Sequence, residues 1–77
     1  MKAEAKLRKR SVTIAGHRTS VSLEPEFWEA LAEVADATNR PLARLIADID
    51  RRSGRQTSLS SALRLYILAH FRQKAGR

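Results

Sequence analysis

Two prolines and one glycine divide this chain into a segment with the periodicity of a β-strand and three segments with the periodicity of helices. Pro25 and Pro41 each precede a run of apolar residues at helical spacing. Proline is favoured at the first position of a helix because it lacks an N–H group that would be unpaired there. Gly54 ends the second run, as glycine commonly does at the carboxyl end of a helix. We therefore expect a strand at 18–23 and helices at about 25–38, 41–53 and 59–73.

Apolar residues recur three and four positions apart in all three helical segments, which is the spacing of a buried helix face. The third segment carries two such strips, and a chain of 77 residues is too short to bury both of them. A second copy of the chain is the simplest cover for the remaining strip, so we expect a homodimer. Its predicted core comprises Val21, Leu23, Trp28, Leu31, Leu45, Ile46, Ile49, Leu63 and Ile67.

Residues 11–23 alternate between apolar and polar types, which is the pattern of a half-buried strand. Ala15 and Gly16 interrupt the alternation. A two-residue turn at that point would pair 11–14 with the following strand. The alternative is that the residues before the interruption form an arm along a partner molecule, and both arrangements remain open. In the hairpin arrangement the apolar face comprises Val12, Ile14, Val21 and Leu23, and the polar face comprises Thr13, Arg18, Ser20 and Ser22.

The chain is strongly basic, with 15 Lys and Arg against 8 Asp and Glu and a net charge of +7 at neutral pH. Such a balance indicates a polyanionic partner, and nucleic acid in the first place. Residues 1–10 are rich in cations and precede any periodic segment, so we expect a flexible basic arm attached to a single domain formed by 11–77. The phosphate contacts expected of this arm involve Lys2, Lys6, Arg8, Lys9 and Arg10.

Several classes of protein are disfavoured by what the chain lacks. It has no cysteine, and neither His17 nor His70 has a second ligand at metal-binding spacing, so we expect no disulfide and no bound metal. No candidate base accompanies a nucleophile and no glycine-rich phosphate loop is present, so we expect neither an enzyme nor a cofactor. No apolar run reaches the roughly 18 residues of a transmembrane helix, and no apolar signal segment follows the basic start. We therefore expect a cytoplasmic protein without a membrane partner.

The order strand, helix, short turn, helix resembles that of the ribbon-helix-helix repressors, the group that contains Arc and MetJ. The resemblance runs from about Arg18 to Asp50, and most of this stretch reads RTSVSLEPEFWEALAEVADATNRPLARLIADI. The continuation SLSSALRLYILAHF resembles a bacterial subfamily with an additional C-terminal helix. The resemblance implies a mostly α fold with a short β element, assembled as an intertwined homodimer. In that family one strand from each subunit forms an antiparallel ribbon that enters the major groove of DNA.

Carried onto this sequence, the resemblance implies base contacts from Arg18, Ser20 and Ser22 and a phosphate contact at the start of the second helix, where Arg40 stands. An arginine can hold guanine with two hydrogen bonds, and serine can donate to or accept from several bases. The function implied is that of a transcriptional regulator, a repressor, bound to double-stranded DNA. Two alternatives stay open, an antitoxin component and a protein-interaction module that docks a partner protein through its apolar helices.

Overall fold

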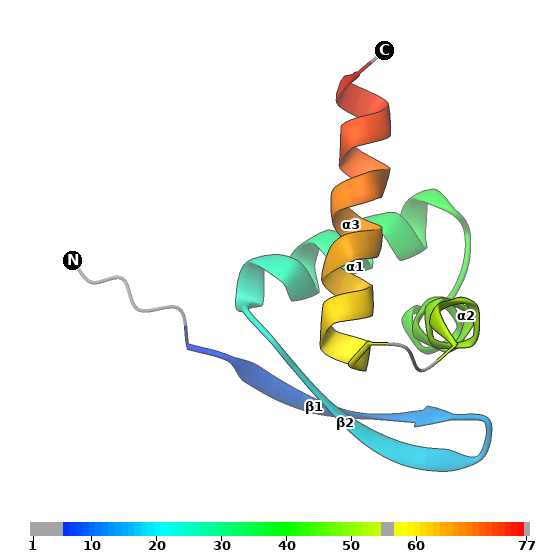
Figure 1. The fold of residues 1–77 in the computed structure, drawn as a ribbon. Helices are drawn as coiled ribbons and strands as arrows, with labels where there is room; N and C mark the ends of the chain where they lie inside the picture. Colours follow the sequence, from blue (N-terminus) through cyan, green and yellow to red (C-terminus); the bar gives the residue numbers. More distant parts are fainter. Residues whose placement is uncertain (1–5, 55–56, 77) are drawn as a thin grey trace.

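A β-hairpin followed by three helices forms the fold, in a computed structural model that describes residues 6–54 and 57–76 (Figure 1). This is the predicted arrangement of a mostly α protein with a short β element. The observed helix and strand bounds lie within three residues of the expected ones. The elements are β1 (Arg8–Ile14), β2 (His17–Leu23), α1 (Pro25–Ala37), α2 (Leu42–Ser53) and α3 (Leu59–Ala75). No helix in these described ranges is long and apolar enough to cross a membrane.

The hairpin resolves the two arrangements that the sequence leaves open at residues 11–14. β1 pairs antiparallel with β2 of the same chain, with Ile14 opposite His17 and Arg8 opposite Leu23. Ala15 and Gly16 form the turn with φ angles of 52° and 83°, and two successive positive φ angles are typical of the type I′ turn that matches the twist of paired strands. An intersubunit ribbon would therefore have to use the opposite edge of β2.

The predicted basic arm is three residues too long, because Arg8, Lys9 and Arg10 are the first residues of β1. Contacts with α1 account for the difference. The indole Nε1–H of Trp28 donates a hydrogen bond of 2.9 Å to the carbonyl of Arg8. The guanidinium of Arg10 lies over the indole ring, 4.8 Å from its centre, where a cation is attracted to the π-electrons. Lys6 precedes the strand and is exposed, and Lys2 lies outside the described residues.

Local chemistry favours the start of each helix and the end of α2. Pro25 is the first residue of α1, and Pro41 caps the start of α2. Gly54 ends α2 in a left-handed conformation with φ of 65°. The hydroxyl of Ser58 accepts a hydrogen bond of 3.2 Å from the backbone N–H of Ser61 and so caps α3.

The hydrophobic core lies between the inner face of the hairpin and the three helices. The nine residues predicted for a dimer core are all buried here, each at most 4% exposed, and they are buried within one chain. Their part in a dimer core stays a prediction, and within the single chain they already form the core. The physical reason is that the hairpin adds a layer carrying Ile14, Val21 and Leu23, and this layer covers the helices. The second apolar strip of α3 does stay exposed, at Leu65 and Leu68.

Candidate nucleic-acid interface

The hairpin has an inner face against the helices and an outer face directed away from them. Residues opposite each other on paired strands point to the same side, so the register places Thr13 beside Arg18 and Ser11 beside Ser20. All three helices lie on one side of the hairpin (Figure 1). We call the other side the outer face, and it comprises Lys9, Ser11, Thr13, Arg18, Ser20 and Ser22.

The outer face brings together the three base-contact residues expected from the sequence. Arg18 and Ser20 are exposed, and Ser22 is partly buried. Their neighbours on β1, Ser11 and Thr13, are also exposed. The sequence places Thr13 on this face but assigns it no role, and Ser11 is missed altogether. The signal that identifies both is the two-residue turn, because it determines which residues of β1 accompany those of β2.

The chemistry of the outer face suits the edges of base pairs. Arg18 and Lys9 are cationic donors, and the four hydroxyl side chains can both donate and accept hydrogen bonds. A two-stranded ribbon is also of a width that the major groove of DNA admits. Cations and hydroxyls together on such a ribbon can therefore meet both phosphates and bases.

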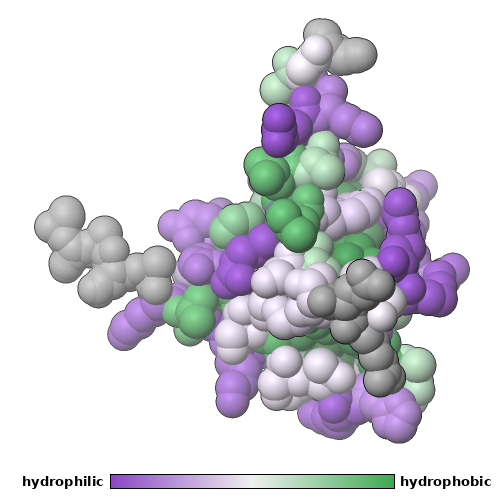
Figure 2. All heavy atoms as spheres, viewed as in Figure 1, coloured by the Kyte–Doolittle hydropathy of each residue, from purple (hydrophilic) through white to green (hydrophobic). Residues whose placement is uncertain are grey.

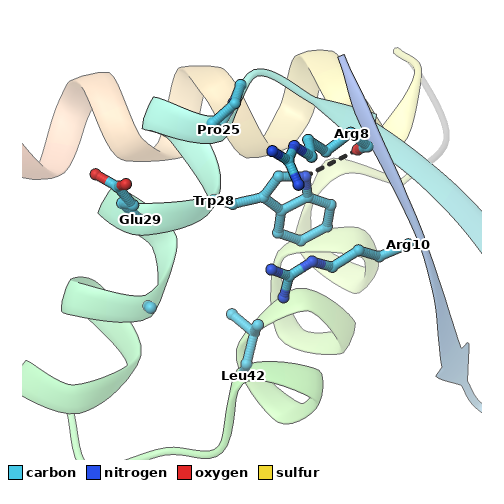
Figure 3. A pocket seen from close by; sticks show the side chains of 7 residues that line it. Arg8, Arg10, Pro25, Trp28, Glu29 and Leu42 are labelled. Atoms are coloured by element: carbon cyan, nitrogen blue, oxygen red, sulfur yellow. Dashed lines mark hydrogen bonds between the residues drawn. The ribbon is translucent and has the colours of Figure 1, made fainter. Parts of the chain in front are cut away.

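The inner side of β1 is anchored beside a hollow of about 340 Å³ between the hairpin, α1 and α2. Figure 3 shows Arg8 and Arg10 extending from β1 toward the ring of Trp28, with the hydrogen bond to the Arg8 carbonyl drawn as a dashed line. Thus the cations of the expected arm that lie in β1 point to different sides of the strand. Arg8 and Arg10 lie on the inner side of the strand, and Lys9 lies on the outer face.

The carboxyl end of β2 is held by α3. The hydroxyl of Ser60 donates a hydrogen bond of 3.0 Å to the backbone carbonyl of Ser22, a residue 38 positions earlier in the chain. Nearby, Arg64 binds the carboxylate of Glu24 at 2.9 Å. A backbone hydrogen bond lowers the pKa of Glu24 below its ordinary value, and the hydrogen bond from Arg64 lowers it further. These contacts connect the candidate DNA-binding strand to the helical support.

Arg40, the expected phosphate contact, is engaged within the chain. Its guanidinium lies 2.8 Å from a carboxylate oxygen of Asp48, and it also donates to the hydroxyls of Thr38 and Tyr66 at 3.2 and 3.4 Å. The side chain is only 29% exposed. The hydrogen bond from Arg40 lowers the pKa of Asp48 below its ordinary value, which burial alone would raise. The charge of Arg40 is therefore largely compensated by this carboxylate.

The cations that remain at the surface near Arg40 are Arg44 and Arg51, both on α2. They lie 3.6 and 2.9 Å from Asp48, the carboxylate that Arg40 also binds. The sequence pattern alone assigns neither of them a binding role. Their spacing of four and three residues from Asp48 is the signal that would have identified them as members of one cluster. Three arginines around one carboxylate give this cluster of four side chains a net positive charge.

A basic, hydroxyl-rich two-stranded ribbon on a support of helices defines a class, that of small DNA-binding domains that use β-strands in a groove. Comparison with protein-family models shows to which family of that class the chain belongs. The family model described as "Ribbon-helix-helix domain" matches residues 7–71, and the chain therefore belongs to the ribbon-helix-helix family. Proteins of this family are in general DNA-binding regulators that bind as dimers, and their domains are typically not enzymes. No curated protein and no solved structure gives a significant match to the chain.

Proposed function

We propose that this protein is a sequence-specific transcriptional regulator, a repressor, that binds double-stranded DNA as a homodimer through the outer face of the hairpin. The observation that carries the proposal is the outer face itself, where Arg18 and Ser20 stand exposed on a ribbon that the major groove can admit. A protein that occupies the groove excludes other proteins from the same site, which is why we propose repression.

The proposed contacts divide into two kinds. Arg18, Ser20 and Ser22 meet base edges, because they share the face of β2 that points away from the core. Lys6 and Lys9 meet phosphates, since a flexible ammonium group serves as a point charge for the DNA backbone. Arg40 is assigned no contact with DNA, because Asp48 already binds its guanidinium.

The homodimer rests on the family and on α3. Leu65 is 60% exposed and Leu68 is 50% exposed, three positions apart on one side of the helix. Figure 2 shows hydrophobic atoms reaching the surface along α3. Because the predicted dimer core is already buried in one chain, we assign the contact between chains to this exposed strip, which we call the α3 strip (Leu65, Leu68 and Ala69).

Selection from random-sequence DNA tests the proposal, with the wild-type protein and the variants Arg18→Ala and Arg72→Ala. Arg72 is an exposed arginine near the end of α3 and serves as the matched control. We expect the wild type and Arg72→Ala to enrich the same palindrome, and Arg18→Ala to lose preference at one position of each half. Strong, salt-dependent binding with no enriched sequence would contradict a specific regulator and indicate an architectural protein.

The α3 strip also favours a second candidate, a module or antitoxin component that binds another protein. An apolar strip of this kind, exposed on the surface, is a feature of protein interfaces. As a module without DNA function the isolated chain would be a monomer and would bind no DNA selectively, whereas an antitoxin would bind its own promoter as well as its toxin. Sedimentation and the selection experiment together therefore separate the regulator from the module.

A further inference from the structure

We infer that the hollow between the hairpin, α1 and α2 binds a small aromatic carboxylate, with its anionic group on Arg8 and Arg10 and its ring on the apolar wall beside Trp28. The inference goes beyond the proposed function, because it concerns the inner side of β1 and requires no contact with DNA. The hollow has a volume of about 340 Å³, near the lower end of the roughly 300–1,000 Å³ of small-molecule sites. The ligand that it holds is therefore small, a compound with a single ring.

The wall that β1 contributes to the hollow is cationic. Arg8 and Arg10 both line it, and both residues are exposed. Among the residues that the structure describes, no carboxylate forms an ion pair with either guanidinium, whereas Arg40 and Arg64 each bind a carboxylate of their own chain. Glu29 also lines the hollow, but Figure 3 shows its carboxylate pointing away from both guanidinium groups. Two such arginines can hold an external carboxylate, because guanidinium N–H groups match its geometry.

The other walls are largely apolar and include an aromatic ring. Pro25, Trp28 and Ala32 come from α1, and Leu42 is the first residue of α2. Figure 3 shows Arg10 extending toward the indole, and its guanidinium lies 4.8 Å from the ring centre. Guanidinium groups stack on aromatic faces, and apolar side chains pack against rings. A flat ring is therefore the hydrocarbon part that suits these walls.

The aromatic wall is fixed before any ligand binds. The indole of Trp28 is buried, and its Nε1–H donates a hydrogen bond of 2.9 Å to the carbonyl of Arg8. A site whose parts are already in place loses less conformational freedom on binding. This contact also keeps the two arginines of β1 beside the hollow.

Ligand binding at this hollow also stabilises the docked position of β1. The guanidinium groups of Arg8 and Arg10 belong to β1, whereas Trp28 and Leu42 belong to the helices, so a ligand touches both parts only while the strand is docked. A ligand that binds one state better than another shifts the population toward that state. Amide exchange in β1 should therefore slow when the ligand is added.

The fluorescence of Trp28 tests the inference directly, because this residue is the only tryptophan of the chain and lines the hollow. The full chain is titrated with benzoate, with the neutral benzamide and with inorganic phosphate, all at constant ionic strength. We expect benzoate to give a saturable change with a Kd on the order of 1 mM, as suits so small a ligand. Benzamide and phosphate should bind at least roughly tenfold more weakly, since each lacks one of the two recognised parts.

Each other outcome of the titration overturns the inference. Benzamide that binds as well as benzoate would show that the arginines do not recognise an anion. Phosphate that binds as well would show an unspecific cluster of cations. The absence of a saturable change with benzoate would show that the hollow holds no such ligand.

Substitutions separate this site from the general positive charge of the protein. Arg10→Gln should weaken benzoate binding by about tenfold or more, the usual loss for a hydrogen bond to a charged group. Arg18→Gln removes an equal charge on the outer face and should leave benzoate binding unchanged. Ala32→Phe should fill the hollow without altering the charge, and the chain should stay folded because Ala32 is exposed. Far-UV circular dichroism checks the fold, and benzoate binding should be lost.

Two results with the variants would contradict the proposed site. If Arg18→Gln weakens benzoate binding as much as Arg10→Gln does, the protein attracts the anion only through its net charge. If folded Ala32→Phe binds benzoate like the wild type, the ligand does not occupy the hollow. Selection from random-sequence DNA is independent of these titrations, so the proposed function can fail or stand separately from this inference.

Discussion

At the scale of single residues, Trp28 joins the first strand to the rest of the domain. Its ring belongs to the core, and its Nε1–H binds the Arg8 carbonyl at 2.9 Å. We expect Trp28→Phe to keep an aromatic ring in the core but to remove this hydrogen bond, lowering the free energy of unfolding by about 1 kcal/mol or somewhat more. Denaturant unfolding measures the change, and amide exchange should show the largest loss of protection in β1. Unchanged exchange in β1 would show that this contact does not anchor the strand.

A second residue, Asp48, makes the free energy of unfolding depend on pH. The hydrogen bond from Arg40 lowers its pKa below the ordinary value of 3.8 in the folded chain. A carboxyl group with a lowered folded pKa stabilises the protein above its unfolded pKa, and that contribution is lost as the pH falls through the folded value. Asp48→Asn should therefore be less stable than the wild type at pH 7, with the difference shrinking below about pH 4. Chemical denaturation across this pH range measures the difference in unfolding free energy between the two proteins. A difference that persists at the lowest pH would contradict the ion-pair explanation.

At the scale of elements, neighbouring residues of β2 lie on opposite faces, so their substitutions should differ in their effect on the free energy of unfolding. Val21 is 1% exposed, whereas Ser20 stands on the outer face. Val21→Ser removes apolar contacts and buries a hydroxyl, so we expect a loss of about 2–3 kcal/mol in unfolding free energy. Ser20→Ala, the matched surface variant, should change it by less than about 0.5 kcal/mol. Thermal and denaturant unfolding of both variants compare them, and a Val21→Ser protein of wild-type stability would mean that the inner and outer faces are exchanged.

At the scale of the whole molecule, dimerisation is assigned to the α3 strip. We expect sedimentation to give about twice the chain mass of 8.7 kDa at micromolar concentration. Leu65→Glu/Leu68→Glu should yield a folded monomer, because both side chains are exposed in one chain and charges would face each other across the interface. Leu7→Glu, at another exposed leucine, should stay dimeric. A dimer that survives the double substitution would place the interface elsewhere.

The basic charge of the molecule should appear in the salt dependence of DNA binding. Removing one phosphate contact reduces the slope of log affinity against log salt by about 0.9. We expect Lys6→Ala and Lys9→Ala each to flatten the slope and to weaken selected and random DNA alike, because phosphates carry no sequence information. Lys74→Ala, near the C-terminal end of α3, serves as the control. An unchanged slope in the Lys6 and Lys9 variants would exclude these residues from the interface.

Much of the fold follows from local signals that do not depend on distant residues. Pro25 and Gly54 set helix boundaries through their own backbone chemistry. The alternation of 18–23 determines which side of that strand faces inward, since a shift of one residue would exchange Val21 with Ser20. The Ala15-Gly16 turn likewise determines the hairpin register, once a two-residue turn forms there.

Contacts between distant residues decided the remainder. Residues 8–10 show no apolar alternation. They form part of a strand because Trp28, about twenty residues later, binds the carbonyl of Arg8 and contacts the guanidinium of Arg10. Arg40 resembles a surface cation in sequence, but the folded chain brings Asp48 and Tyr66 to its guanidinium.

The sequence by itself determined the three helices, the strand at 18–23 with its inner and outer faces, and the basic character of the chain, because periodicity, capping and charge are properties of neighbouring residues. Only the tertiary structure decided that the apolar stripes bury one another within one chain and leave the α3 strip exposed. An apolar residue is buried equally well by its own chain or by a partner, and the hydrophobic effect does not distinguish between them. The choice depends on whether the hairpin covers the helices, which is a matter of geometry in three dimensions.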